Sequence, residues 1–533
     1  MEVLRKLLVE GGTEESVAEA VLQLVAKLVA RNSELEQRLA KAATLTRKNE
    51  GLSAEQLLLM LDELTESKDA EVAKANAGLR RVSDVEKWLE TAETEEPPAQ
   101  PPARKPAPPE LRRMENVLTV PEAERPCPKC GQPRECIGHD VTEVVDLIPA
   151  QVVVRLDKRE KLACRACESE VVRAPAGDKV VAGGKLGSGL VAQVVVDKYW
   201  DGLPLHRQKE RFARLGFPVA VSTLADQVTW GTDLLRPLWR SVISHVLAAK
   251  VMHLDGTSLS VLDRDAPTGI KLGSLWGYVG VTGEVRMALY LYASTGKATA
   301  QRPGELGPED MLSLRQGYTV ADASSLFDKS FKRPELIECG CNMHSRRYFL
   351  KALDAGDTRA SLPLAAFKTL YKVEDEVQNL ADDERLAARR ARSKPVYDEL
   401  ASWCRTHRPH EPPSSALGKA IQYLLNHEAA LKRFLENGAI PFDNGVVERL
   451  HVRAALTRKN YLFAGSDAGA ERAAIAYTLL GCCELAGVDP VRYLAGVLPL
   501  LSRKVMLKNI PALLPAPWKA AHPDVAAANT SSA

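Results

Sequence analysis

The chain has 533 residues and a net charge of +2, from 71 Lys and Arg against 69 Asp and Glu. This length exceeds a single hydrophobic core, so we expect roughly three or more domains. The near-neutral charge means that any affinity for nucleic acid must come from local basic patches. No run approaches the roughly 20 apolar residues that cross a bilayer, and the start MEVLRKLLVEGG lacks a signal-peptide core. We therefore expect a cytoplasmic protein without membrane contact.

The first predicted element is a helix over residues 13–42. Thr13 can cap it, and leucines recur along it at three- and four-residue steps. Asn32 falls on the same seam, as a register-setting polar residue of a coiled coil does. Two arrangements fit this pattern. The helix either self-associates, or it forms an intramolecular hairpin with a second helix that begins after Ser53.

A proline-rich spacer, EPPAQPPARKPAPP over residues 96–109, separates this region from two C-x-x-C pairs. The paired cysteines are Cys127, Cys130, Cys164 and Cys167. Each pair presents two thiolates from a tight turn, and together they complete a tetrahedral structural zinc site. Cys136 and His139 lie nearby and can replace a ligand. Because four protein ligands close the coordination sphere, this zinc is expected to hold a fold and do no chemistry.

Residues 187–235 are expected to be helical, with a turn at Gly216 and a following helix capped by Ser222 or Thr223. This order is typical of a helix-turn-helix DNA-binding unit. The helix before the turn carries basic side chains that are available to phosphates. They are Arg207, Lys209, Arg211 and Arg214. A solvated charged face on a helical bundle explains the same charges.

From residue 249 the pattern changes to strands. AKVMHLDGTSLSV is one strand, and GYTVAD is another. Between them, GSLWGYVGV and EVRMALYLYAS form an antiparallel hairpin around a turn at Thr282 and Gly283. A long, charged, helix-forming stretch follows over residues 346–437, and a further helical segment begins near Asn444.

Three carboxylates stand out in this part of the chain. Asp255 and Asp322 lie at or near the apolar ends of two strands, and Glu448 lies in the helical segment. Carboxylate oxygens suit Mg²⁺ or Mn²⁺. Two such ions about 4 Å apart activate a nucleophile and stabilise the leaving oxygen in phosphoryl transfer. The residue types therefore indicate a two-metal site.

Each carboxylate also has a simpler interpretation. Asp255 can form a turn before Gly256, Asp322 can cap a helix, and Glu448 can pair with a neighbouring arginine. Several other acids compete for the same role. They are Asp263, Asp265, Asp328 and Glu471. Spacing alone leaves the choice open.

Basic side chains lie close to the third carboxylate. Those that can neutralise flanking phosphates are Arg449, Arg453, Arg458 and Lys459. Arg346 and Arg347, next to His344, either contact a DNA backbone or form structural ion pairs. Cys339 and Cys341 with His344 lack one side of a ligand set, so we expect no second metal site there.

From about residue 15 to residue 500 the chain resembles transposases of the insertion sequence 66 family, a bacterial group with a DDE catalytic core. The most specific stretch is DNGVVERLHVRAALTRKNYLFAGSDAGAERAAIAYTLLGCCELAGVDPVRYL. The segment KYWDGLPLHRQKERFARLGFPVAVSTLADQV and the two C-x-x-C pairs also match the family. Around the second acid the chain reads TVADASSLFD where the family usually has D-G-Y, so Asp328 remains an alternative to Asp322.

The resemblance implies a multidomain α+β protein with a ribonuclease H-like α/β catalytic core and a helical insertion. A zinc-ribbon-like module and an N-terminal helical or coiled-coil region would precede the core. Asp255, Asp322 and Glu448 would be the catalytic triad and hold Mg²⁺ or Mn²⁺, while the cysteine pairs hold Zn²⁺. The expected activity is metal-dependent cleavage of double-stranded DNA at the ends of an insertion sequence, followed by strand transfer.

The same resemblance implies a nucleoid-associated homo-oligomer in a bacterial cytoplasm. Element ends and target DNA would be its partners, together with small accessory proteins of the same element. The alternatives are a catalytically inactive relic that only recognises element ends, and a nuclease or resolvase that acts alone.

The predicted domains follow in chain order. They are an N-terminal helical or coiled-coil region (1–95), a Pro-rich linker (96–113), a zinc-binding module (114–178), a helix-turn-helix-like region (179–247), the first part of the catalytic core (248–345), a helical insertion (346–437), the last part of the core (438–500) and a C-terminal tail (501–533).

Overall fold

The structure is a computed structural model of the whole chain. It describes residues 70–82, 132, 151–158, 160–162, 172–173, 180, 184, 186–503 and 506–526. The predicted helix over residues 13–42, the spacer and the four candidate zinc-binding cysteines lie outside these residues. Among the helices of the described segments, none is long and apolar enough to cross a membrane.

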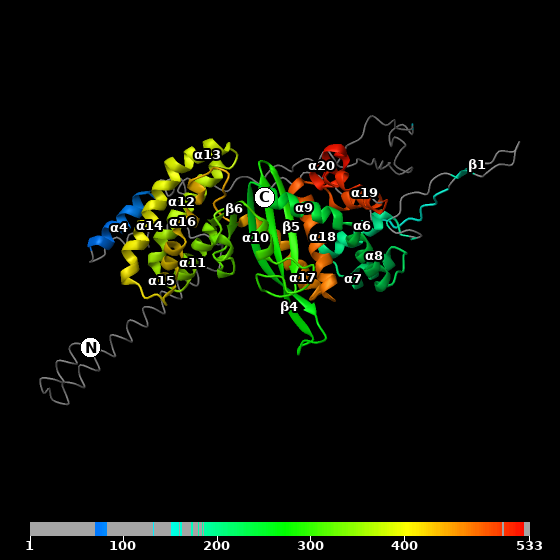
Figure 1. Cartoon of the computed structure of the whole chain (residues 1–533), viewed down its shortest axis with the longest axis horizontal. Helices are drawn as coiled ribbons and strands as arrows, with labels where there is room; N and C mark the ends of the chain where they lie inside the picture. The colour runs from blue at the N-terminus through cyan, green and yellow to red at the C-terminus, as the bar shows by residue number, and fades with distance from the viewer. Residues whose placement is uncertain are drawn as a thin grey trace, which may run out of the picture.

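A mixed five-stranded sheet forms the centre of the molecule (Figure 1). Its strands are β3 (Val251–Leu262), β4 (Ile270–Thr282), β5 (Val285–Ala293), β6 (Gly317–Ala321) and β7 (Leu336–Gly340). Their order across the sheet is β5-β4-β3-β6-β7. The three strands β3, β4 and β5 are antiparallel neighbours, whereas β6 runs parallel to β3 and β7 runs parallel to β6. A separate two-stranded ladder joins β1 (Lys161–Leu162) to β2 (Val172–Arg173).

The predicted strands in this region are confirmed, including the hairpin of β4 and β5. Gly283 in its turn has φ +59°, a left-handed conformation that favours glycine. Strand β7 was not predicted. Its five residues, LIECG, are too short and too polar to show an apolar alternation.

Helices on one side of the sheet come from segments that directly precede and follow it in the chain (Figure 1). Those before the sheet are α6 (Ser188–Tyr199), α7 (Leu205–Arg214), α8 (Val221–Leu234) and α9 (Arg236–Ala248); those after it are α17 (Gly445–Tyr461), α18 (Asp467–Ala486), α19 (Pro490–Ser502) and α20 (Pro515–Ala521). Helix α17 packs on β3 and β4, and α18 packs on β5. A continuous hydrophobic core joins these helices to the sheet.

The helix-turn-helix order of α7 and α8 agrees with the prediction, and Gly216 between them has φ +81°. The predicted cap is wrong. Helix α8 begins at Val221 after Ala220, which has an extended backbone and no capping side chain. The hydroxyls of Ser222 and Thr223 therefore lie inside the helix, because the turn is shorter than the sequence indicated.

Between β7 and α17 the chain forms a second group of helices with its own hydrophobic core. They are α11 (Asn342–Asp354), α12 (Ser361–Val377), α13 (Asp382–Ala388), α14 (Lys394–His407), α15 (Ala416–Asn426) and α16 (Glu428–Leu431). The short helix α10 (Pro308–Leu314) precedes β6. Helix α4 (Ala70–Val82) packs on α12 and α14, where the Trp403 indole donates to Asn76 Oδ1 at 2.8 Å.

Candidate active site

Three carboxylates from separate elements converge at one end of the parallel strand pair. Asp255 lies in β3, opposite Gly277 of β4. Asp322 directly follows β6, whose register pairs Val320 with His253, so the two aspartates lie at the same level on neighbouring strands. Glu448 lies in the first turn of α17, which packs on β3. Asp255 and Asp322 line a pocket of about 180 Å³.

The carboxylates influence one another electrostatically. Burial raises the pKa of Asp255, and the nearby Glu448 raises it further. The hydrogen bond from the Gly256 amide and the positive charge of Arg347 lower this pKa and so oppose the shift. Burial also raises the pKa of Asp322, and Asp255 and Glu448 add to that shift. Like charges held this close disfavour full ionisation. The site is therefore strongly suited to cations.

A buried asparagine fixes Glu448 relative to Asp255. Asn444 is fully buried at the start of α17, and its Nδ2 donates to the Leu254 carbonyl at 2.8 Å. His253 Nδ1 lies 2.9 Å from Asn444 Oδ1. Burial lowers the pKa of His253 to about 4, so its ring is neutral and Nδ1–H donates to the amide oxygen. The helix that carries Glu448 is thus tied to the strand that carries Asp255.

The sequence analysis did not find this link. Its signal was the D-N pair that precedes E-R in the quoted family stretch. Asp443, the first residue of that pair, accepts from the Tyr371 hydroxyl at 2.9 Å and from the Gly445 amide at 2.8 Å. Both residues of the pair therefore position the helix.

The side chains of Arg347 and His344 on α11 lie against Glu448. Arg347 Nη2 lies 3.1 Å from Oε2, and His344 Nε2 lies 3.7 Å from Oε1. The Cys341 sulfur joins His344 and Glu448 in a group whose donor atoms lie within 4.8 Å of one another. Glu448 thus joins Cys341 and His344, two of the three residues for which the sequence showed an incomplete ligand set. Burial raises the pKa of the Cys341 thiol to about 12. Its sulfur accepts a hydrogen bond from the backbone N–H of Asn444, so this side chain helps to hold the start of α17 in place.

The site has the features that a divalent cation requires. Its donor set is dominated by carboxylates, which Mg²⁺ and Mn²⁺ prefer. Within the described residues, Glu448 Oε1 and His344 Nδ1 are among the buried polar atoms without a hydrogen-bond partner. A buried polar atom without a partner costs free energy unless a water, an ion or another group interacts with it. The residues present therefore fit a bound cation.

The predicted DNA-binding side chains divide into two groups. Exposed ones lie along α7, at the start of α11 and along α17: they are Arg207, Lys209, Arg347, Arg449, Arg453 and Lys459. The side chains of the other group are at least partly buried; Arg347, although exposed, also has an internal partner in Glu448. Arg211 pairs with the buried Asp197, and Arg458 donates to Thr257 Oγ1 at 2.8 Å and to the Ser258 carbonyl. Arg346 is half-buried on α11.

The competing acids lie elsewhere. Asp263 pairs with Lys271 at 3.3 Å, and Glu471 pairs with Arg236. Asp265 is exposed in the turn between β3 and β4. Asp328 is exposed at the end of a short 3₁₀ turn and does not line the pocket that Asp322 lines.

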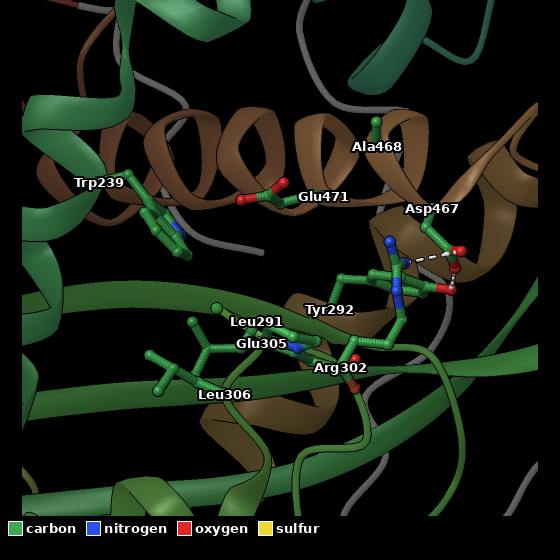
Figure 2. Close-up of a pocket in the computed structure, with 11 residues that line it drawn as sticks. Trp239, Leu291, Tyr292, Arg302, Glu305, Leu306, Asp467, Ala468 and Glu471 are labelled. Atoms are coloured by element: carbon green, nitrogen blue, oxygen red, sulfur yellow. Dashed lines mark hydrogen bonds and ion pairs between the residues drawn. The ribbon is translucent and has the colours of Figure 1, made fainter.

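A second pocket, of about 250 Å³, lies between β5 and the start of α18 (Figure 2). Asp467 accepts from the Tyr292 hydroxyl at 2.6 Å and pairs with Arg302 at 2.7 Å and Lys271 at 2.9 Å. Each acid that lines this pocket has a partner: Glu305 accepts from Ser294, and Glu471 pairs with Arg236. The contacts of Asp467 anchor α18 to the sheet. The acids of the D-A-G-A-E-R part of the family stretch therefore have a structural role.

Comparison with known proteins identifies the class to which this fold and site belong. The family model described as "Transposase IS66 family" matches residues 183–472, which include all three carboxylates. A second model, "zinc-finger binding domain of transposase IS66", matches residues 124–168, which include all four paired cysteines. The molecule is thus a transposase-type protein with a zinc-finger domain. The chain belongs to the IS66 family of transposases.

Proteins of Sinorhizobium fredii (strain NBRC 101917 / NGR234) are similar along most of the chain. The uncharacterized protein y4hP is 32% identical over 489 residues, covering 88% of this chain and 84% of that protein. The uncharacterized protein y4qI is 28% identical over 531 residues, covering 97% of this chain and 96% of that protein. The likeness thus extends beyond the sheet to the N-terminal region.

Proposed function

We propose that the chain is a DDE-type transposase that cleaves double-stranded DNA at the ends of a bacterial insertion sequence and transfers the cut strand to a target. The observation that carries the proposal is the placement of three acids. One lies in β3, one follows the adjacent parallel strand β6, and one lies in the helix that packs against β3. The strand order β5-β4-β3-β6-β7, with three antiparallel and two parallel members, supports a ribonuclease H-like core.

In this proposal Asp255, Asp322 and Glu448 hold Mg²⁺ or Mn²⁺. When bound, the divalent cations activate a hydroxyl nucleophile and stabilise the charge that develops on the leaving oxygen. The chain's own residues prepare the site. Asn444 fixes the distance between helix and strand, while Arg347 and His344 hold the Glu448 carboxylate.

Other modules bring the DNA to the site. Exposed basic side chains of α7 and α17, such as Arg207 and Lys459, contact phosphates and position the duplex without reading its sequence. A zinc ion held by the C-x-x-C pairs stabilises the fold of the module that contains them, residues 114–178. Self-association through residues 13–42 pairs two chains on two element ends. The protein acts on DNA in the bacterial cytoplasm, at the nucleoid, together with small accessory proteins of the element.

The test uses conservative changes that remove a charge from the site: Asp255→Asn, Asp322→Asn and Glu448→Gln. Each is expected to abolish nicking of a duplex that contains an element end, and joining of the cut end to a target, in Mg²⁺ or Mn²⁺. DNA binding, measured by mobility shift, should persist because it rests on phosphate contacts elsewhere. Asp263→Asn and Asp328→Asn are the matched controls and should keep activity.

The outcomes separate the alternatives. Loss of activity in Asp328→Asn but not in Asp322→Asn would reassign the second ligand. Binding without cleavage in the wild-type protein would leave a DNA-binding relic. Cleavage without joining would leave a nuclease or resolvase. Full activity in all three site variants would exclude the proposed mechanism.

A further inference from the structure

A buried histidine faces the metal-binding side of Asp255. His451 lies three residues after Glu448, so both side chains leave the same face of α17. Its Nε2 is 3.7 Å from Asp255 Oδ2, and its Nδ1 is 3.2 Å from the hydroxyl of Tyr290 in β5. His451 is 7% exposed and Tyr290 is 1% exposed. The contact with Tyr290 is a hydrogen bond, whereas the contact with Asp255 is longer than a hydrogen bond and is electrostatic.

The two contacts select one tautomer of the ring. A phenol hydroxyl is a good donor, so Tyr290 donates to Nδ1, and the ring proton then resides on Nε2. That proton points toward the Asp255 carboxylate. The other tautomer would direct a lone pair at a carboxylate, which is repulsive.

The facing strand leaves space for this ring. Gly277 of β4 is the residue paired with Asp255. A Cβ at this position would lie 2.6 Å from His451 Cε1 and 3.0 Å from Nε2, closer than real contacts allow. Gly277 is not among the glycines of the described residues with positive φ. Its backbone does not require glycine, so the ring is what a side chain here would displace.

We propose that His451 is a positioning residue for Asp255, with Nε2–H orienting the carboxylate toward the cation and Tyr290 holding the ring. This inference rests on the proposed function, because it gives Asp255 the role of a metal ligand. Groups that hydrogen-bond a ligating carboxylate typically change metal affinity by 10–100-fold when they are removed. Glu448 is then oriented by side chains of α11, and Asp255 is oriented by a side chain of α17, the helix that carries Glu448.

The test measures Mn²⁺ binding to the full-length protein without DNA, by electron paramagnetic resonance. His451→Leu should weaken Mn²⁺ affinity by roughly 10–100-fold. His451→Gln, whose amide N–H reaches toward the position of Nε2, should restore most of it. Tyr290→Phe removes only the hydroxyl and should weaken affinity several-fold, since the ring loses its tautomer control.

Two glycine changes separate ring placement from general crowding. Gly277→Ala should weaken Mn²⁺ affinity although it removes no polar group, because the methyl displaces His451. Gly280→Ala in the same strand is the matched control. Its methyl meets Val246 and Ala249 at about the same closeness and should leave Mn²⁺ affinity unchanged.

The result that would overturn the inference is an unchanged Mn²⁺ affinity in both His451→Leu and Tyr290→Phe, while Asp255→Asn binds weakly. His451 would then only fill space, and the proposed function would stand. If the wild-type protein binds no Mn²⁺, or if Asp255→Asn binds it like wild type, the metal site of the proposed function fails together with the inference. Equal Mn²⁺ affinities in His451→Leu and His451→Gln would also exclude a role for the N–H.

Discussion

Asp255 and Asp322 lower the stability of the metal-free protein at neutral pH. Burial and neighbouring acids raise the pKa of each carboxyl in the folded state. The unfolded chain then releases these protons more readily, so stability falls as pH rises from about 4, the ordinary value, through the raised pKa values. Below that window both carboxyls are protonated in either state and the penalty disappears. A cation that binds the folded site reverses the penalty at neutral pH.

We therefore expect Asp255→Asn to be at least as stable as wild type near pH 7 without divalent ions. A gain of about 1 kcal/mol would raise Tm by roughly 2–4 °C for a unit of this size. Mn²⁺ should raise the Tm of the wild-type protein and leave that of the variant almost unchanged. Scanning calorimetry with and without Mn²⁺ measures both effects. Asp263→Asn, outside the site, is the control, and an equal Mn²⁺ response in all three proteins would contradict the expectation.

At the scale of single elements, helix α7 shows how one helix divides its charges. Arg207 and Lys209 are exposed, whereas Arg211 turns inward to Asp197, a carboxylate that is almost fully buried. Gln193 Nε2 also donates to Asp197, at 2.7 Å. On the sequence alone, these three side chains were assigned, together with Arg214, to one DNA-binding group. The structure gives Arg211 a packing role as well, because removing one partner of a buried ion pair is costly.

This division predicts different effects for two similar changes. Arg211→Ala should lower the free energy of unfolding by about 2–4 kcal/mol, since Asp197 loses its cation. Arg207→Ala should change stability by less than about 0.5 kcal/mol and weaken DNA binding at low salt. Denaturant unfolding and a salt titration of DNA binding measure the two properties. A destabilised Arg207→Ala with an unaffected Arg211→Ala would reverse this assignment.

Local patterns predicted the elements of the sheet that have strong local signals. Alternating apolar residues revealed β3, β4 and β5, and a glycine turn revealed their hairpin, because these features depend on neighbours in sequence. Strand β7 has no such signal. The links that build the site join distant residues: His253 meets Asn444, and His451 meets Asp255, only after β3 and α17 have packed. Asp255 and Asp322 were found at the ends of predicted strands, and Glu448 was found in the family stretch. The groups that orient these acids required the fold.

At the scale of the whole molecule, each chain carries one candidate site but a reaction on two element ends needs two. The predicted seam over residues 13–42 lies outside the described residues, so its role is tested in solution. Leu28→Glu together with Leu35→Glu places charges on that seam and should convert a dimer to monomers. Light scattering measures the mass. Wild-type and variant proteins of the same mass would favour the intramolecular hairpin, and a lysine-to-glutamate change outside the seam, Lys27→Glu, is the control.

The docking of α4 on the insertion has a consequence for synthesis on the ribosome. Asn76 and its partner Trp403 are 327 residues apart in sequence. At translation rates of about 5–20 residues per second, α4 emerges roughly 15–60 s before the helix that receives it. During that interval Leu79, which is buried in the folded protein, cannot pack against α14. The α4 segment therefore remains without its packing partners until then, and the insertion completes its core only late in translation.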